Sequence, residues 1–272
     1  MLLRESQFLE LEGGAPLLMQ NHFYLHKNAT TAWKKTRIWT QLVLNREDTS
    51  SQSLDDEKKA NALSAGVSNL NISNGNGHKP DRKAENYGLK IMQRPDRILR
   101  KDADRTFLTE PKRQLLITLL DSLKTLFNDY QQTMSYVSGI LLLFFDAKTV
   151  FEMMFMLGRS PKYNMSGYWR SEAVAQGIDA YVLYEIIKQV NPALYAHLQK
   201  MNVLPDTFIQ KWFGGLAVQV MPTQHLIDFW TQFFKHGFRY LFKFAIALLQ
   251  ALSPLLLSIH TDHKLYEVLR VE

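Results

Sequence analysis

Apolar residues recur at helical spacing along most of the chain after residue 110. Pro111 suits the first turn of a helix, because its fixed backbone angle fits there and no helical hydrogen bond is lost. One buried helix face is then indicated by the 3,4 spacing of Leu116, Leu119, Leu120, Leu123, Phe127 and Tyr130. We therefore predict a long amphipathic helix that begins near Pro111.

Further apolar segments follow, and several of them are stopped by Gly, Pro or Asn-Pro. Helices are expected over residues 134–145, 150–157, 178–190, 194–199, 205–214, 223–235 and 238–252. A short early helix is expected to share one face among Ile38, Leu42 and Trp39. Because the period-2 alternation of strands is nearly absent, the predicted fold class is all-α.

The composition changes between residues 46 and 86, which are charged at first and then rich in Ser, Asn and Gly. Ten of the fourteen residues from Ser64 to Gly77 are one of these three types. Such a segment cannot bury enough apolar surface to offset the entropy lost on ordering. We expect a flexible insertion at 46–86, inside a single domain that spans residues 1–272.

Composition also narrows the chemistry. The 272 residues are 46% hydrophobic and include no cysteine, so disulfides, thiolate metal sites and a cysteine nucleophile are excluded. Lys and Arg number 32 against 26 Asp and Glu, a formal net charge of +6. This charge weakly favours an acidic partner, but without a dense basic run we expect no nucleic-acid binding.

Two segments bear on targeting. Residues 1–12 contain no long apolar run, so a signal peptide is not expected. The stretch Phe244 to Ile259 is apolar, but Gln250, Ser253 and Pro254 interrupt it, and it is shorter than the roughly 20 residues of a spanning helix. A buried core helix is predicted there, with a membrane anchor as the alternative.

Generic catalytic motifs are absent from the sequence. No glycine-rich phosphate loop and no Gly-x-Ser-x-Gly elbow occurs, so the chain is not expected to bind nucleotide alone. His260 and His263 lie around Asp262, with loose spacing for metal ligands. A solvated turn near the C-terminus is favoured there over a zinc site.

Two short segments carry more specific chemistry. Asp102 and Arg105 are three residues apart, which allows the carboxylate to orient the guanidinium. By themselves they also fit a surface ion pair. Some 25 residues later, after the predicted long helix, the sequence reads Tyr130-Gln-Gln132.

Together these segments resemble the TBC domain of Rab GTPase-activating proteins. That family's first motif, I-x-x-D-x-x-R-T, is matched by Leu99, Asp102, Arg105 and Thr106. Its second motif, Y-x-Q-G, is matched by Tyr130 and Gln132, with Thr133 in place of glycine. Its R-x-x-x-W, R-W-F, P, I-W-D and G-x-x-x-L-F elements resemble Lys35 with Trp39, Lys211 to Phe213, Pro222, Phe229 to Thr231, and Gly237 to Phe242. Order and rough spacing are kept from about residue 31 to 259.

The resemblance implies a multi-helix TBC-type domain that supplies two catalytic side chains to a partner GTPase. Arg105 would be the arginine finger, which neutralises charge on the transferring phosphoryl group. Gln132 would be the glutamine finger, whose amide holds the attacking water. Asp102 would orient Arg105, Tyr130 would hold the glutamine loop, and Thr106 completes the first motif.

Each assignment has a simpler rival. Arg105 can be an ordinary solvated arginine, and a shift of one residue would make Gln131 the finger instead of Gln132. Trp39, Trp212, Phe213 and Trp230 are expected in the core, because bulky aromatics at helical spacing usually fill interiors.

Two departures from the family pattern have expected consequences. Thr133 replaces a glycine, so a backbone that needs positive φ at this point would be strained and Gln132 displaced. Thr231 replaces the usual aspartate after Trp230, which is expected to remove a hydrogen-bond acceptor.

The resemblance also defines the expected partners. The chain would activate a Rab-family GTPase in vesicle trafficking without catalysing a reaction of its own. It would carry no cofactor, because GTP and Mg²⁺ belong to the GTPase. We expect a cytoplasmic protein that associates peripherally with anionic endomembranes. The alternative is a scaffold on the same fold, which binds a GTPase or an effector without stimulating hydrolysis.

Overall fold

The computed structural model describes residues 34–44, 58–65, 96–106 and 108–271. These residues form helices and connecting turns, with no β-strand among them, which confirms the all-α fold class. In chain order the elements are α3 (Trp39–Leu44), α6 (Arg97–Asp104), α7 (Glu110–Phe127), α8 (Thr133–Phe144), α9 (Ala147–Arg159), η3 (Met165–Tyr168), α10 (Val174–Val190), α11 (Pro192–Lys200), α12 (Asp206–Ile209), η4 (Gln210–Gly214), α13 (Thr223–His236), α14 (Arg239–Ser258) and α15 (Asp262–Arg270).

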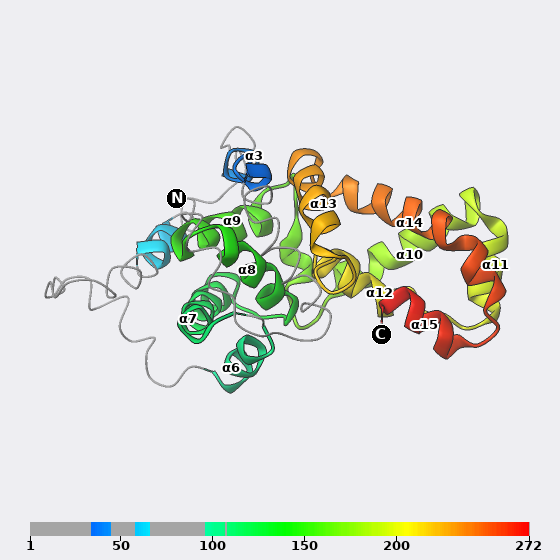
Figure 1. Ribbon diagram of the computed structural model, residues 1–272, viewed down its shortest axis with the longest axis horizontal. Helices are drawn as coiled ribbons and strands as arrows, with labels where there is room; N and C mark the ends of the chain where they lie inside the picture. Colours follow the sequence, from blue (N-terminus) through cyan, green and yellow to red (C-terminus); the bar gives the residue numbers. More distant parts are fainter. Residues whose placement is uncertain (1–33, 45–57, 66–95, 107, 272) are drawn as a thin grey trace, which may run out of the picture.

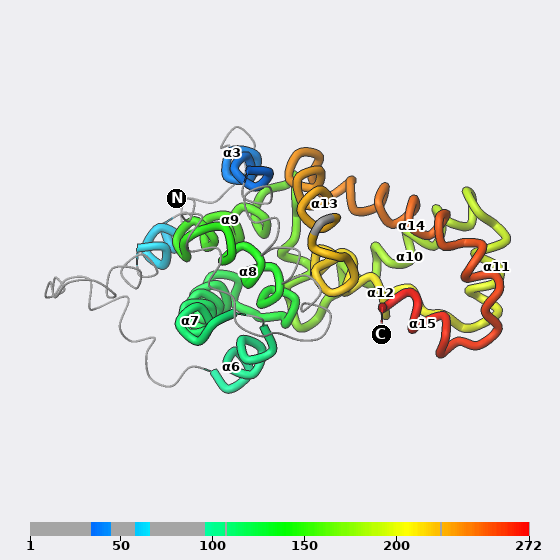
Figure 2. The backbone as a smooth tube through the Cα atoms, viewed as in Figure 1, coloured from blue at the N-terminus to red at the C-terminus, as the bar shows by residue number. Residues whose placement is uncertain are grey.

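The helices form an elongated molecule with two ends (Figure 1). At one end α6, α7, α8 and α9 pack on one another, and α3 lies against α9 and α13. At the other end α10, α11 and α14 pack together. The tube in Figure 2 shows the C-terminal helix α15 turning back toward the middle, where it packs on α12. One hydrophobic core runs through both ends, from Trp39 to Leu269.

The long helix predicted after Pro111 is α7, and Pro111 lies in its first turn. Its buried face carries the leucines of the predicted pattern. The helix ends at Phe127 because Asn128 adopts the left-handed conformation, which Asn tolerates better than most residues. Tyr130 was predicted on the same helix face, but it lies past this end, in the connection to α8.

The predicted aromatic core is confirmed, since Trp39, Trp212, Phe213 and Trp230 are all fully buried. Trp39 packs edge-on against Phe144 and Phe234, with ring centroids 5.4 and 5.2 Å apart. The predicted face of the early helix was wrong in one member. Ile38 is 45% exposed, and Trp39 points into the core instead, together with Val43 one turn later.

The acceptor expected to be lost at Thr231 is present. The Trp39 indole Nε1–H donates to Thr231 Oγ1 at 2.9 Å. The threonine hydroxyl in turn donates to the carbonyl of Ile227, one helical turn earlier, at 2.8 Å. A hydroxyl can accept one bond while donating another, so threonine serves here in place of aspartate.

Two further expectations change. Residues 58–65, inside the predicted insertion, form a helix that buries Ala60 and Ser64; the rest of 46–86 lies outside the described residues. The residues around His263 form a helix, α15, rather than a solvated turn, because Leu265 and Leu269 provide a buried face that the sequence reading missed.

Helix α14 is longer than the sequence suggested. It continues through Pro254 to Ser258. Pro254 cannot donate to the carbonyl of Gln250, but Gln250 is an exposed residue, so water can replace that hydrogen bond. At 20 residues it is long and apolar enough to cross a membrane by length and composition. It nevertheless packs against α10, α11 and α13, and buries Leu241, Ala245, Leu249 and Leu256 in the core.

Candidate functional site

Helix α6 presents the first candidate motif. Asp96 caps its N-terminus, because the carboxylate Oδ1 accepts from the Ile98 N–H at 2.9 Å. The other carboxylate oxygen pairs with Lys124 of α7 at 2.5 Å, so the cap also fastens α6 to its neighbour. Hydrogen bonds from Lys124 and then from Ile98 lower the pKa of Asp96. The N-terminal end of α6 is therefore held against α7, which orients the helix that carries the motif residues.

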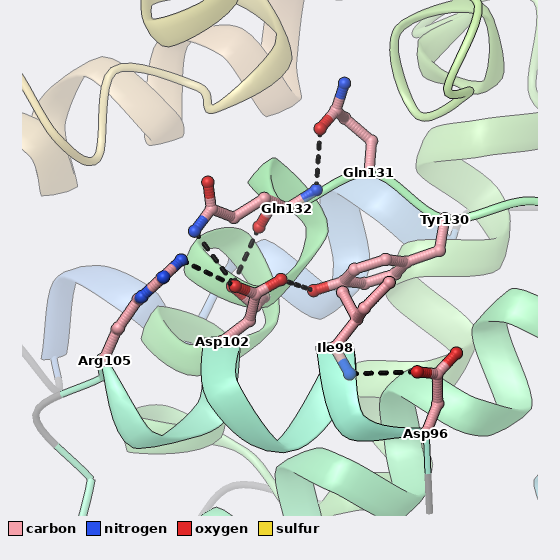
Figure 3. Close-up of polar contacts among 8 residues, drawn as sticks. Asp96, Ile98, Asp102, Arg105, Tyr130, Gln131 and Gln132 are labelled. Atoms are coloured by element: carbon pink, nitrogen blue, oxygen red, sulfur yellow. Dashed lines mark hydrogen bonds and ion pairs between the residues drawn. The ribbon is translucent and has the colours of Figure 1, made fainter.

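Asp102 is the centre of the site, on the buried side of α6. Its carboxylate accepts three hydrogen bonds from residues of both motifs (Figure 3). Arg105 Nη1 donates to Oδ1 at 3.1 Å, and Gln132 Nε2 donates to the same oxygen at 3.0 Å. The Tyr130 hydroxyl donates to Oδ2 at 2.8 Å. All three candidate partners, 3 to 30 residues away in the chain, thus meet on one acid.

Burial differs sharply across the ion pair of the site. The side chain of Asp102 is 6% exposed, whereas that of Arg105 is 60% exposed. The three donated hydrogen bonds satisfy the buried carboxylate, because burying an unpaired charge would cost free energy. The exposed guanidinium uses one nitrogen on Asp102, and its fork keeps further N–H groups for an outside ligand.

Gln131 and Gln132 are adjacent in sequence but point in different directions. The Gln132 side chain extends toward Asp102 on the same side as Arg105, while Gln131 points away (Figure 3). Gln131 Oε1 instead accepts from the backbone N–H of Gln132 at 2.8 Å. The structure thus places Gln132 beside Arg105 and gives Gln131 a local backbone contact.

The backbone of Gln132 is held by the start of α8. Its carbonyl accepts from both the N–H and the hydroxyl of Ser135, at 2.9 and 2.8 Å. Gln132 itself has helical angles, φ −52° and ψ −33°. Both the peptide unit and the side chain of the candidate glutamine are therefore fixed.

The expected strain at Thr133, from a backbone that needs positive φ, does not occur. Thr133 is the first residue of α8, and no positive φ is found for it among the described residues. Its side chain is buried, and its hydroxyl has no hydrogen-bond partner. The substitution for glycine therefore leaves an unsatisfied buried hydroxyl, while Gln132 still reaches Asp102.

Asp129 and Ser171 belong to the site although the sequence reading missed them. The Asp129 carboxylate accepts from the backbone N–H of Ser171 at 2.9 Å and from its hydroxyl at 2.8 and 2.9 Å. These bonds, led by the one from the Ser171 N–H, lower the pKa of Asp129. They tie the loop before Gln132 to the segment before α10. The only sequence signal was an Asn-Asp pair after an apolar helix, which is typical of any turn.

Two tyrosines lie near enough to the Asp102 carboxylate for its charge to raise their pKa values. Burial, followed by the charge of Asp102, raises the pKa of Tyr130 far above its usual range, so its hydroxyl stays a donor. Tyr136 lies one turn into α8. Burial and then Asp102 raise its pKa, and Arg105 opposes the rise. Thr106 is buried below the site and donates to the Ala103 carbonyl at 2.6 Å, which closes the end of α6.

No group of three His, Asp or Glu side chains that could hold a metal ion occurs in the part of the chain that the structure describes. His263 faces Glu267 at 3.2 Å within α15. His260 lies near the ring of His197, with centroids 6.1 Å apart. The histidine pair of the sequence reading is thus split between separate contacts.

A family model described as the Rab-GTPase-TBC domain matches residues 35–257 of the chain. Mouse TBC1 domain family member 4 is 25% identical over 209 residues, which cover 72% of this chain and 16% of that protein. Human TBC1 domain family member 1 is 28% identical over 133 residues, which cover 47% of this chain and 11% of that protein. The chain therefore spans only a small part of the length of these two relatives.

A solved structure has a similar fold. The crystal structure of the Chlamydomonas flagellar RabGAP TBC domain aligns with a TM-score of 0.54 at 17% sequence identity. The alignment covers 96% of this chain and 91% of that one. At this identity the likeness concerns the arrangement of helices.

Proposed function

The chain belongs to the Rab-GTPase-TBC domain family, and from that premise we propose that it stimulates GTP hydrolysis by a Rab-family GTPase with two fingers supplied in trans. Arg105 is the arginine finger and Gln132 the glutamine finger. The observation that carries the proposal is that both side chains donate to one oxygen of Asp102, and so lie side by side. GTP and Mg²⁺ are bound by the GTPase, and this chain contributes no cofactor.

The two fingers address the two difficulties of the reaction. Charge develops on the phosphoryl oxygens, and the N–H groups of Arg105 that do not contact Asp102 can donate to them. The attacking water must be oriented, and Gln132 keeps its Oε1 and one amide N–H for the water and the phosphate. Asp102 acts as a positioning residue, because it sets both side chains before the GTPase arrives and lowers the ordering cost of the encounter.

The alternative, a scaffold without activity, depended on Thr133 displacing the glutamine. The hydrogen bonds of Gln132 to Asp102 and Ser135 support the activator instead. We further propose that the protein works in vesicle trafficking, in the cytoplasm, and that it associates peripherally with anionic membranes.

The test is GTP hydrolysis by a panel of Rab proteins with catalytic amounts of this chain. Arg105→Ala should lower the stimulated rate roughly a thousandfold or more. Gln132→Ala should lower it by a large factor, whereas Gln131→Ala, the matched control, should change it little. Circular dichroism checks that each variant is folded.

Three outcomes would contradict the proposal in different ways. A larger loss of activity with Gln131→Ala than with Gln132→Ala would show that Gln131, not Gln132, is the glutamine finger. Activity that survives Arg105→Ala would remove the arginine finger. Binding of a Rab without any stimulation by the unmodified chain would establish the scaffold.

A further inference from the structure

Exposed cations are frequent along three segments, residues 34–44 with α3, then α13 and α14, of which α13 packs against both of the others. This region, the basic corner, is defined by the exposed side chains of Lys34, Lys35, Arg37, Lys235, Arg239 and Lys243. The same three segments, residues 34–44, α13 and α14, contain one acidic residue, Asp228. These segments thus hold six cations and one anion, while the whole chain has a formal net charge of +6. These cations come from segments far apart in sequence whose helices pack on α13.

Packing between α3 and α13 places residues 34–37 beside the first turns of α13, the helix that carries Lys235 in its last turn. Lys35 Nζ pairs with Asp228 Oδ1 at 2.6 Å, and Trp39 donates to Thr231 in the next turn. The two helices therefore run side by side in the same direction. Figure 1 shows α3, α13 and the start of α14 along one edge of the molecule.

The turn from α13 to α14 completes the corner. Gly237 has a φ of +70° and packs on the backbone of Lys162, and the N–H of Phe238 donates to the Lys162 carbonyl at 2.8 Å. This fixed turn places Lys235, in the last turn of α13, just before Arg239, in the first turn of α14. Within the described part of the chain, neither side chain has an ion-pair partner, so their charge is not locally neutralised.

The chemistry of the corner suits an anionic bilayer. Each Lys or Arg near such a surface contributes about 1 kcal/mol of attraction. Ile38, which is 45% exposed, follows Arg37 directly and offers an apolar side chain for the headgroup region. Single-stranded nucleic acid would need exposed rings for stacking, but Trp39, Trp230 and Phe234 are fully buried here.

The corner is also separate from the finger site, the cluster of Asp102, Arg105, Tyr130 and Gln132. Helix α6, which Arg105 directly follows, lies on the opposite edge of the molecule from α3 (Figure 1). We infer that the basic corner is the surface with which this protein docks onto membranes rich in anionic lipid. The inference rests on the membrane association in the proposed function and identifies the residues responsible for it.

The test is flotation of the full chain with vesicles of phosphatidylcholine alone, or of phosphatidylcholine containing phosphatidylserine. The corner variant is Lys235→Gln combined with Arg239→Gln. The matched control is Lys200→Gln combined with Lys264→Gln, which removes the same charge from exposed lysines of α11 and α15. Like Lys235, Lys200 lies in the last turn of its helix.

We expect binding only to the anionic vesicles, weakened by salt. The corner variant should bind roughly thirtyfold more weakly, the value for two cations at about 1 kcal/mol each. The control should bind within a few-fold of the unmodified chain. Circular dichroism melting should show the same stability for all three proteins.

Several results would overturn the inference. One is that the unmodified chain does not bind anionic vesicles. Another is an equal loss of binding in the control, which would show that net charge alone decides the binding. Equally tight, corner-dependent binding to duplex DNA would indicate a general polyanion surface. A higher KM of the corner variant for a Rab without vesicles would make the corner a GTPase contact. Because flotation needs no GTPase, failure of GTPase stimulation would not be confused with failure of docking.

Discussion

The finger site and the basic corner are built in opposite ways. The site gathers side chains from residues 102 to 132 onto one buried carboxylate, so its parts are close in sequence as well as in space. The corner joins residues 34–37 to residues 235–243, and the ion pair that fastens residues 34–37 to α13, between Lys35 and Asp228, spans 193 residues. Short motifs therefore reveal the first region, whereas only the packing of α3 on α13 reveals the second.

The two regions also differ in what holds them. At the site a desolvated acceptor depends on its donors, so a change there affects both geometry and stability. At the corner the cations are solvent-exposed, and exposed charges contribute little to folding. Mutations should therefore separate the regions, since corner charges can be removed without loss of stability but the site acceptor cannot.

The largest effect is expected at the backbone frame of the corner. In Gly237→Ala, the new Cβ would lie 2.3 Å from the Lys162 carbonyl oxygen, at a φ of +70°. Strain and overlap together should reduce the free energy of unfolding by about 3 kcal/mol, as measured by urea denaturation. Gly177→Ala is the control, because its new Cβ would have no atom within 4 Å apart from its chain neighbours and the backbone of its own helix. Equal effects of the two changes would contradict this account.

The next effect concerns the shared acceptor of the site. Asp102→Asn replaces one carboxylate oxygen by a donor that faces Arg105, Gln132 or Tyr130, so the fingers lose their common anchor. Because a misplacement of about 1 Å can cost a hundredfold in rate, the kcat of stimulated hydrolysis should fall roughly a hundredfold. Vesicle flotation should not change. Asp104→Asn, an exposed neighbour on α6, is the control, and a similar loss there would sink the positioning role.

A smaller change is expected where α3 rests on α13. Thr231→Val removes the acceptor of the buried Trp39 indole N–H and leaves it unsatisfied. Unfolding free energy should drop by about 2 kcal/mol in a denaturation experiment. Thr231→Ser keeps a hydroxyl and should lose clearly less. If valine were as stable as threonine, the hydrogen bond would not be what holds the two helices together.

The smallest effect has the opposite sign. Thr133→Val removes the unsatisfied hydroxyl while keeping the shape of the side chain, so the protein should be more stable by about 1 kcal/mol. Stimulated hydrolysis should stay within a few-fold, since Gln132 keeps its contacts. Ser135→Ala, on the same helix, removes a satisfied hydroxyl and should destabilise instead. A stabilised Ser135→Ala would show that hydroxyl satisfaction does not decide stability here.

The sequence predicted the all-helical class and the boundary of α10 at Asn191-Pro192 because these features depend on local spacing and on proline. It predicted the aromatic core for the same reason. It missed α15, whose short apolar pattern of Leu265 and Leu269 is hidden among polar residues. It placed Ile38 in the core because periodicity alone cannot choose which neighbouring residue faces inward.

Within the site, the motif spacing indicated Asp102, Arg105, Tyr130 and Gln132, and these residues do meet in space. What spacing could not supply was the contact between Asp129 and Ser171, because a carboxylate that holds a loop 42 residues away has no pattern in sequence. The same limit explains Thr231, whose hydroxyl replaces an expected carboxylate only because Trp39 lies within reach.

Under the proposed function, the single carboxylate that receives both Arg105 and Gln132 has an evolutionary consequence. If each finger had its own anchor, activity would decline in two separate steps, and either step could be reversed alone. With Asp102 shared, a single codon change would disable both fingers together, while the basic corner and the aromatic core remained unchanged. If both proposals hold, a descendant of this protein could lose the stimulation of hydrolysis in one substitution and still bind a GTPase and an anionic membrane.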